Sequence, residues 1–463
     1  MEKYFFIGIG GISMSGIAIT IHAMGHEVSG SDRSESDTTR MLEKDGIKVC
    51  IGQRYENITD DVTTVVYSAA IHEDNPEMMH ARELEKAGTC RVISRAVILG
   101  ELLSAYQVPI GVAGSHGKTS TSSILAHIYM AAGRDPSFNI GGILHNTGTN
   151  YRVGKGDCMI IEACEYTDSF LHFHAKYNVI TNIEPEHLDY FKTFEREQHS
   201  FQEYAAGMIE GGALITSPEC APLFRNMLQN RDIRIITVSL DDPSADCKVS
   251  SIEHHREGLG YRFSLDYQGK ALGPFDIYLP GMHMVFDAAC AALLSYEEGV
   301  DPAYIAEGIA AYRSTKKRFE YLGSYHGAMV IDDYAHHPTE IRAQLIAARE
   351  VPHKELYLVF QPHTYSRTIA FYDDFVKALS LADHIYLCDI YAAREKDTGE
   401  VSSAMLAASL KEAGADAVYV PLFEDIQKIL EKKISTGDML ITMGAGNAVD
   451  IAHALLQTAG TEE

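Results

Sequence analysis

The segment GVAGSHGKTS, residues 111–120, has the composition of a loop that binds phosphate. Glycines at 114 and 117 would let backbone N–H groups approach phosphate oxygens, and Lys118 would place a positive charge on the outer phosphates. Thr119 offers a hydroxyl to Mg²⁺, and the helix expected after it directs its positive dipole end at the anion. Val112 stands where the usual G-x-x-x-x-G-K-[ST] motif has its first glycine. A glycine turn with an exposed lysine therefore remains an alternative.

Two further polar residues follow apolar strands later in the same block. Glu162 ends the run CMIIE, and His187 follows the run NVITN. A carboxylate after a strand can hold a magnesium ion that bridges phosphates, and a neutral imidazole can hold a second divalent ion. The alternatives are an exposed carboxylate at a strand end and a structural histidine.

The first glycine-rich turn, GIGGIS, spans Gly8 to Ser13 and follows the apolar run YFFI. The dinucleotide-binding fingerprint has glycine where this chain has Ser13, and Asp32 stands about twenty residues on, where it can accept a ribose hydroxyl. The pattern predicts a turn that cradles a diphosphate. A tight turn without ligand, or an NAD-dependent oxidoreductase built on this motif, are the alternatives.

A third group of charged and imidazole side chains lies in the last block of the chain: Arg318 stands in the linker TKKRF, and the others end or follow the strands expected at VIDDY and LYLVF. Arginine binds two anionic oxygens at once, so this group favours an anionic ligand over a metal cluster. No Ser-His-Asp or Cys-His arrangement is evident. The residues are Arg318, Asp332, Asp333, His336, His337, His363 and Arg367.

The elements that must position these residues alternate between strands and helices in three blocks. That order predicts an α/β fold with parallel, doubly wound sheets, whose ligands gather at the carboxyl ends of the strands. We expect domains at 1–106, 107–313 and 314–463, with a more β-rich stretch at about 235–280.

Composition restricts the class of protein. The chain has 463 residues and a formal net charge of -25, which disfavours general binding to nucleic acid. No run approaches the ~20 apolar residues of a membrane span, and the N-terminus does not have the pattern of a signal peptide. Eight scattered cysteines without a C-x-x-C pair are typical of reduced thiols. We therefore expect a cytoplasmic enzyme.

Together these motifs resemble the Mur ligase family over nearly the whole chain. Its phosphate loop, usually G-T-H-G-K-T-[ST], corresponds to GSHGKTS, and four other matches are GIGGISMSG, SAAIHEDNPE, NIEPEHLDYF, and DDYAHHPTE with FQPHTYSRT. The resemblance implies a three-domain amide ligase with a Rossmann-like N-terminal domain, a P-loop-type central domain and a Rossmann-like C-terminal domain. It implies ATP and Mg²⁺ or Mn²⁺ as cofactors, and UDP-N-acetylmuramate and L-alanine as small-molecule substrates of peptidoglycan precursor synthesis.

The resemblance also assigns expected roles to residues. Catalysis would depend on Lys118, Glu162, His187 and Arg318. ATP would be bound by Gly114, Ser115, His116, Gly117, Lys118, Thr119, Ser120, Arg318 and Asp333. The UDP-sugar would be bound by Gly10, Gly11, Asp32, Ser68, His337 and Arg367. Metal ions would be held by Thr119, Glu162 and His187.

Four positions depart from the family pattern. Ser13 replaces a glycine, Cys164 replaces the aspartate of E-A-D-E, and Met284 and Asp287 replace two asparagines expected near the nucleotide. The ligase that recycles murein tripeptide onto the same sugar, and a sensor that binds the sugar without turnover, are further alternatives. We expect a monomer or a homodimer, with no nucleic-acid or membrane partner.

Overall fold

The computed structural model describes residues 2–256, 259–393 and 395–459. Its strands form three sheets, and its residues form two compact units. One unit contains the first sheet and most of the second. The other contains the third sheet together with residues 252–256, 259–262 and 276–285.

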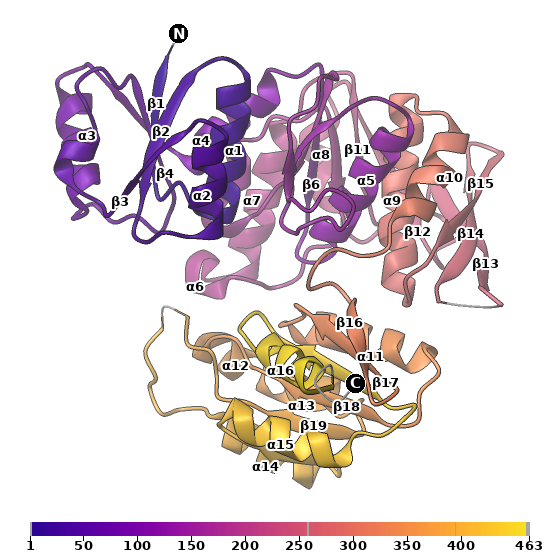
Figure 1. The fold of residues 1–463 in the computed structure, drawn as a ribbon. Helices are drawn as coiled ribbons and strands as arrows, with labels where there is room; N and C mark the ends of the chain where they lie inside the picture. The colour runs from indigo at the N-terminus through magenta and orange to yellow at the C-terminus, as the bar shows by residue number, and fades with distance from the viewer. Residues whose placement is uncertain (1, 257–258, 394, 460–463) are drawn as a thin grey trace. The chain divides into compact units, whose positions relative to one another are not determined.

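The first sheet has five parallel strands in the order β3-β2-β1-β4-β5. Side chains of β1 alternate between two cores: Tyr4 and Phe6 pack with residues of α1, whereas Phe5 and Ile7 pack with residues of α3. Figure 1 shows α3 on one side of this sheet and α1 and α4 on the other. The elements are β1 (Lys3–Ile7), α1 (Ile12–Ala23), β2 (Glu27–Asp32), α2 (Asp37–Lys44), β3 (Lys48–Ile51), β4 (Thr64–Tyr67), α3 (Pro76–Lys86), β5 (Arg91–Ser94) and α4 (Arg95–Ser104).

The second sheet has ten strands in the order β15-β14-β13-β12-β11-β10-β6-β9-β7-β8. Strand β6 lies between β9 and β10, and the register pairs Val112 with Glu162 and Ala113 with Ile180. The segments that follow these three parallel strands therefore begin at one edge of the sheet.

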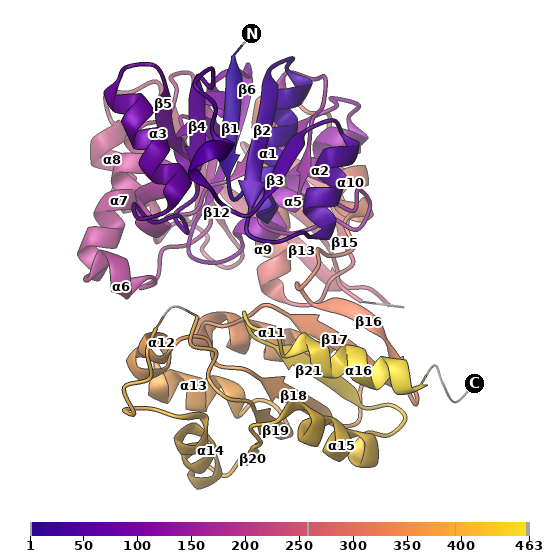
Figure 2. The same ribbon diagram turned by 60° about the vertical axis from the view of Figure 1, so that its left-hand side comes forward.

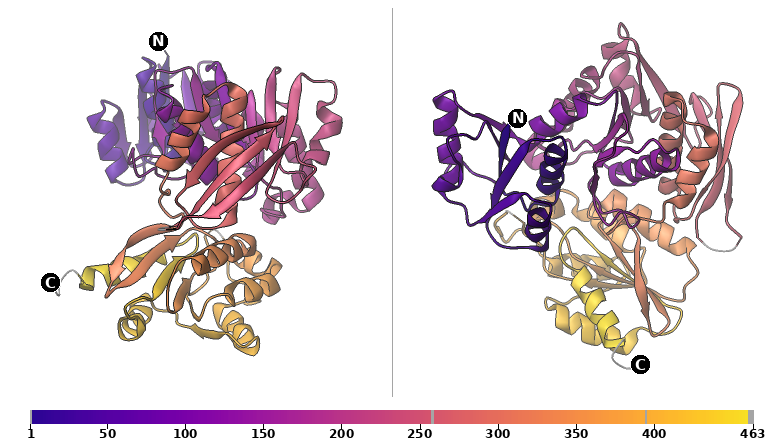
Figure 3. Two further views of the ribbon diagram at one scale, coloured as in Figure 1. Left: turned by 90° about the vertical axis from the view of Figure 1, so that its right-hand side faces the viewer. Right: turned by 45° about the horizontal axis from the view of Figure 1, so that its top comes forward.

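At the other end of the order, β13 to β15 extend the sheet as the pink strands of Figure 3. The strands are β6 (Val108–Ala113), β7 (Ser137–Asn139), β8 (Tyr151–Arg152), β9 (Cys158–Glu162), β10 (Tyr177–Ile180), β11 (Gly212–Thr216), β12 (Ile233–Ser239), β13 (Cys247–His254), β14 (Tyr261–Tyr267) and β15 (Lys270–Ile277). The helices are α5 (Lys118–Ala131), α6 (Leu188–Phe191), α7 (Phe194–Ala206), α8 (Ala221–Leu228), α9 (Met282–Glu298) and α10 (Pro302–Ala311).

Helix α4 joins the first sheet to the second. Its residues Leu99 and Leu102 belong to the same buried core as Phe170. Gly100 lies so close to the following domain that an added Cβ would be 2.1 Å from the carbonyl oxygen of His172. This continuous core explains why the first two sheets belong to one unit.

The third sheet has the order β16-β17-β21-β18-β19-β20, with β16 antiparallel to β17 and the other neighbours parallel. One face packs against α11, α13 and α14, and the other packs against α15 and α16. Figure 2 shows this sheet with its helices. The elements are β16 (Glu320–Tyr325), β17 (Ala328–Asp333), α11 (Pro338–Glu350), β18 (Leu356–Phe360), α12 (Tyr365–Ala370), α13 (Tyr372–Leu379), β19 (His384–Leu387), α14 (Ser403–Glu412), β20 (Asp416–Tyr419), α15 (Phe423–Lys433), β21 (Met439–Met443) and α16 (Val449–Ala459).

The expected α/β class with three sheet-based domains is confirmed. Within residues 2–256, 259–393 and 395–459, none of the helices has the length and apolar character needed to cross a membrane.

Candidate functional site

The loop between β6 and α5 takes backbone conformations that require its two glycines. Gly114 has a φ of +128°, and a Cβ added there would lie 2.1 Å from Thr181 Oγ1. Gly117 has a φ of +83° at the N-cap of α5, and a Cβ there would lie 2.5 Å from Asp287 Oδ1. The positive φ strongly disfavours any other residue at both positions, and at Gly114 the backbone of residues 181 and 182 also leaves little space. The loop is therefore an intact strand–loop–helix turn, and Val112 lies inside the preceding strand.

Asn182 holds this loop against the end of β10. Its side-chain Oδ1 accepts the backbone N–H of His116 at 2.9 Å, and its carbonyl accepts the N–H of Ser115 at 3.0 Å. Its Nδ2 donates to the carbonyl of His116 at 3.2 Å, and Thr181 Oγ1 donates to the same carbonyl. The amides of Ser115 and His116 are thus bonded within the protein. The first turn of α5, Lys118–Ser120, is where N–H groups lack intrahelical acceptors and can serve an anion.

Lys118 is held inside the loop by three acceptors. Its Nζ donates to the carbonyls of Gly114 at 2.5 Å and Ser115 at 3.0 Å, and to Glu165 Oε1 at 3.2 Å. Burial alone would lower the pKa of Lys118, but the negative charges around it, Glu165 foremost, outweigh burial and raise that pKa. Lys118 is therefore a permanent cation at the end of β6.

Glu162 ends β9 beside the same loop. Its Oε2 accepts the hydroxyl of Thr119 at 2.9 Å and the N–H of Gly141 at 2.7 Å. A carboxylate and a hydroxyl in contact are the hard oxygen donors that Mg²⁺ prefers. These residues fit the magnesium ion expected from the sequence.

The carboxylate of Glu165 lies between His187 and Lys118 and contacts both. His187 Nε2 lies 3.4 Å from Glu165 Oε1, and the His187 ring lies 4.7 Å from the ring of Tyr166, centroid to centroid. The backbone of His187 is left-handed, with a φ of 52°. Asp168, two residues after Tyr166, accepts the hydroxyl of Tyr190 at 2.6 Å. The structure thus gathers the candidates Lys118, Thr119, Glu162 and His187 at one edge of the second sheet.

Sequence reasoning assigned no role to Glu165 or Asn182. Both lie just beyond strand ends, which is the only signal that could have selected them. Their roles depend on contacts with a loop distant in sequence.

Two of the four departures from the family pattern lie at this edge. Burial foremost raises the pKa of the Cys164 thiol to about 11, so the thiol stays protonated and neutral. Asp287, on α9, places its carboxylate against Gly117.

The other two departures lie elsewhere. Met284 is buried on α9. Ser13 accepts a hydrogen bond from the guanidinium of Arg95 at 2.9 Å, which ties the first glycine-rich turn to α4.

The first glycine-rich turn also follows a strand end. Gly10 donates its N–H to Asp32 Oδ2 at 2.9 Å, and Gly11 donates its N–H to the carbonyl of Gly8. Ser68 follows β4, which neighbours β1 where the strand order reverses, the usual ligand position in such sheets. Gly10, Gly11, Asp32 and Ser68 therefore occupy the carboxyl edge of the first sheet.

In the second unit, Asp333 ends β17 and accepts the N–H groups of Phe319 and Ala335, each at 2.7 Å. Burial, more than any other cause, raises the pKa of Asp333 to about 7. Arg318 lies over the ring of Tyr334, and Arg367 bonds to His363 at the start of α12. His337 caps α11 in a capping box with Glu340.

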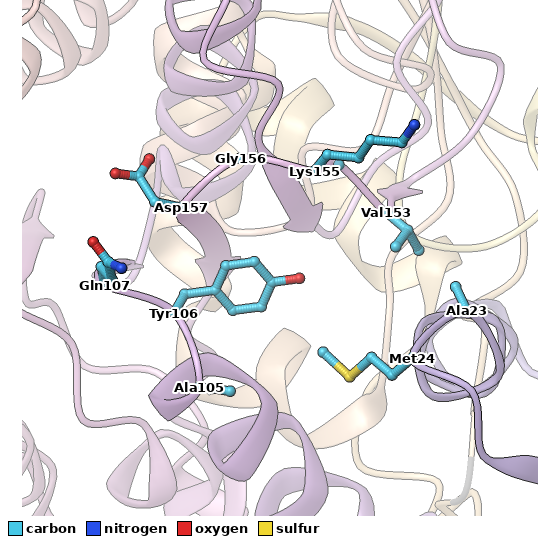
Figure 4. A pocket seen from close by; sticks show the side chains of 10 residues that line it. Ala23, Met24, Ala105, Tyr106, Gln107, Val153, Lys155, Gly156 and Asp157 are labelled. Carbon is cyan, nitrogen blue, oxygen red and sulfur yellow. The ribbon is translucent and has the colours of Figure 1, made fainter.

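A cavity of about 710 Å³ lies at the opposite edge of the second sheet. Figure 4 shows Met24, Tyr106, Lys155 and Asp157 around it, near the first residues of β6 and β9. The phosphate-loop residues follow the last residues of those strands. This cavity is therefore separate from the candidate site.

Comparison with known families matches three domain models to consecutive parts of the chain. They are described as the Mur ligase family catalytic domain, residues 3–107, the Mur ligase middle domain, residues 112–295, and the Mur ligase glutamate ligase domain, residues 317–446.

Individual proteins are similar over nearly the full length. A UDP-N-acetylmuramate–L-alanine ligase of Agathobacter rectalis is 45% identical over 98% of this chain and 97% of its own. One from Lachnospira eligens is 42% identical, with the same coverage. The crystal structure of UDP-N-acetylmuramate–alanine ligase from Thermotoga maritima has 27% identity, covers 100% of both chains and has a TM-score of 0.81.

Proposed function

The chain belongs to the Mur ligase family, and on that premise we propose that it joins the amino group of L-alanine to the carboxylate of UDP-N-acetylmuramate at the expense of ATP. The names of its relatives support this choice of substrates. The observation that carries the proposal is the meeting of Lys118, the Thr119–Glu162 pair and His187 at the carboxyl edge of one sheet.

The reaction needs activation because a carboxylate is a poor electrophile toward an amine. A carboxylate oxygen of the sugar attacks the γ-phosphorus of ATP, ADP leaves, and an acyl phosphate forms. The nitrogen of L-alanine then attacks the acyl carbon, its proton is lost, and inorganic phosphate leaves. Closure of the C-terminal domain would exclude the water that hydrolyses an acyl phosphate.

The central domain supplies charge to the transferring phosphoryl group. Lys118 neutralises the outer phosphates, and the first turn of α5, with Ser120, directs N–H groups at them. The loop Gly114–Gly117 positions these groups through its bonds to Asn182. Mg²⁺, or Mn²⁺ in its place, would be held by Thr119, Glu162 and His187, and would neutralise further phosphate charge.

The other two domains supply the remaining contacts in this proposal. Gly10, Gly11, Asp32 and Ser68 would bind the UDP-sugar, since they share the edge of the first sheet where diphosphates bind. From the C-terminal domain, Arg318 would reach the γ-phosphate, Asp333 would bind the nucleotide ribose, and His337 and Arg367 would contact the sugar. We propose domain boundaries at 1–106, 107–313 and 314–463, and a cytoplasmic monomer or homodimer.

Measuring ADP release tests the proposal. We expect release that depends on UDP-N-acetylmuramate, L-alanine and Mg²⁺ together, and mass spectrometry should detect the sugar enlarged by one alanine. Lys118→Met should lower kcat by about a hundredfold or more, because it removes one charge from the phosphoryl-transfer transition state. Faster turnover with murein tripeptide in place of L-alanine would assign the chain to the recycling reaction instead. Binding of the sugar without any turnover would indicate a sensor.

A further inference from the structure

Lys118 has no proton left for a phosphate in this structure. An ammonium group has three N–H donors, and Lys118 uses them on the carbonyls of Gly114 and Ser115 and on Glu165 Oε1. A nucleotide phosphate can therefore accept a hydrogen bond from Lys118 only after Lys118 has lost its bond to one of these three acceptors.

Glu165 is the one anion among those acceptors. Its side chain is 1% exposed, and both oxygens lie near Lys118 Nζ, at 3.2 and 3.1 Å. Oε1 also lies 3.4 Å from His187 Nε2, whereas among the described residues Oε2 has the Lys118 ammonium as its neighbouring cation and makes no well-aligned hydrogen bond. Burial alone would raise the pKa of Glu165, but Lys118 and His187 outweigh burial and lower it. The group is thus a buried carboxylate shared by two proposed catalytic side chains.

We propose that Glu165 is a positioning residue that takes the place of a nucleotide phosphate while the loop is empty. It neutralises Lys118 in the free protein and gives up that cation when phosphate arrives, and it keeps the imidazole of His187 oriented. This inference rests on the proposed function, because it assumes that Lys118 serves a nucleotide.

Electrostatics supports an exchange over a fixed pair. A buried cation without a counter-ion is strongly destabilising, so the empty loop needs an anion beside Lys118. A phosphate group carries more negative charge than a carboxylate, and Glu165 would repel it at close range. The carboxylate therefore stabilises the free loop and opposes nucleotide binding at the same time.

Glu165→Gln separates these two effects. The amide keeps the shape of the side chain and an oxygen that can accept from His187, but it loses the charge. In EDTA, we expect the variant to bind ADP at least about tenfold more tightly than the wild type in calorimetry. Without ADP, the melting temperature of the variant should be lower than that of the wild type. Saturating ADP should raise the melting temperature of the variant by more degrees than that of the wild type.

Turnover separates positioning from simple destabilisation. Glu165→Gln should lower the KM for ATP and lower kcat. Glu165→Ala should lose more kcat than Glu165→Gln, because His187 then also loses its acceptor. If Glu165→Gln has no higher kcat than Glu165→Ala, Glu165 does not orient the imidazole of His187.

Glu197 offers a control for placing a buried amide in the same domain without a loss of charge, because burial foremost raises the pKa of Glu197 to about 8 and leaves it mostly neutral at pH 7. It is also buried, and its Oε2 accepts the backbone N–H of Glu186 at 3.1 Å, with no bond to Lys118. Glu197→Gln should leave ADP affinity within twofold of the wild type. If Glu165→Gln does not fold, Glu165→Asp serves in its place, because its carboxylate lies further from Lys118 and should also tighten ADP binding.

If Glu165→Gln binds ADP as the wild type does, or more weakly, the proposal that Glu165 gives way to a phosphate is wrong. The same result for Glu165→Asp refutes the proposal where the glutamine variant does not fold. These binding measurements need neither UDP-sugar nor turnover. A wild-type protein that bound no nucleotide would instead refute the proposed function, so the two failures are distinguishable.

Discussion

Replacing Asn182 with alanine should loosen the phosphate loop without touching Lys118 or the residues proposed to hold the metal. The change removes the acceptor of the His116 N–H, 2.9 Å away, and a donor to the His116 carbonyl, 3.2 Å away. The carbonyl keeps its bond from Thr181, and Ser115 keeps its bond to the backbone of residue 182. The loop therefore loses two hydrogen bonds to residue 182 and keeps those that join it to Thr181, to the backbone of residue 182 and to Glu184.

Each lost bond is worth about 1 kcal/mol, so the total is about 2 kcal/mol. If nucleotide binding must restore the loop, this energy corresponds to a rise of up to about thirtyfold in the Kd for ADP. Calorimetric titration of ADP against Asn182→Ala measures it. Asn57→Ala is the control, since Asn57 also makes two side-chain hydrogen bonds but lies in the N-terminal domain. An Asn182→Ala protein with wild-type affinity for ADP would show that the loop does not depend on this residue.

Two other substitutions test separate parts of the site, and a third tests how a buried carboxylate affects stability. Thr119→Val removes the hydroxyl that contacts Glu162, so the Mg²⁺ concentration for half-maximal ADP release should rise at least roughly tenfold; an unchanged Mg²⁺ dependence would exclude Thr119 as a ligand. Asp287→Asn removes a negative charge beside Gly117 and should tighten ADP binding several-fold in calorimetry, and weaker binding would contradict this. Burial, more than any other cause, raises the pKa of Glu197 to about 8, so its protonated form stabilises the fold below pH 4.5 and that contribution is lost as pH rises through 8. Thermal unfolding from pH 5 to 9 should show a smaller loss of stability for Glu197→Gln than for the wild type, and equal losses would refute this reasoning.

The strands and loops that carry the site follow from local sequence. Apolar runs such as YFFI and CMIIE are buried strands, and glycine punctuates the turns after them. Gly133, directly after the C-cap of α5, has a φ of +67°, the left-handed conformation in which glycine commonly ends a helix. Periodicity and turn chemistry suffice here because each signal lies within a few residues of the structure it specifies.

The short strands were harder to predict. Strands β3 and β5 of the first sheet have four residues each, and β16 lies at the edge of the third sheet. Such strands lack a long apolar run, because their pairing with a neighbouring strand defines them.

Contacts across the sheet could not be predicted either. Glu165 and Asn182 acquire their partners from the register that sets β6 between β9 and β10. The sequence displays both residues at strand ends but carries no local signal of which loop they meet.

The neutral thiol at position 164 bears on how this protein withstands oxidants. Peroxides and alkylating agents react with thiolates, and a pKa of about 11 leaves roughly one molecule in ten thousand ionised at pH 7. A sulfur atom beside the phosphate loop would otherwise be a point of chemical damage. Cys164 is only half-buried, so it is the raised pKa that keeps the sulfur in its unreactive thiol form, and peroxide stress should leave this position reduced.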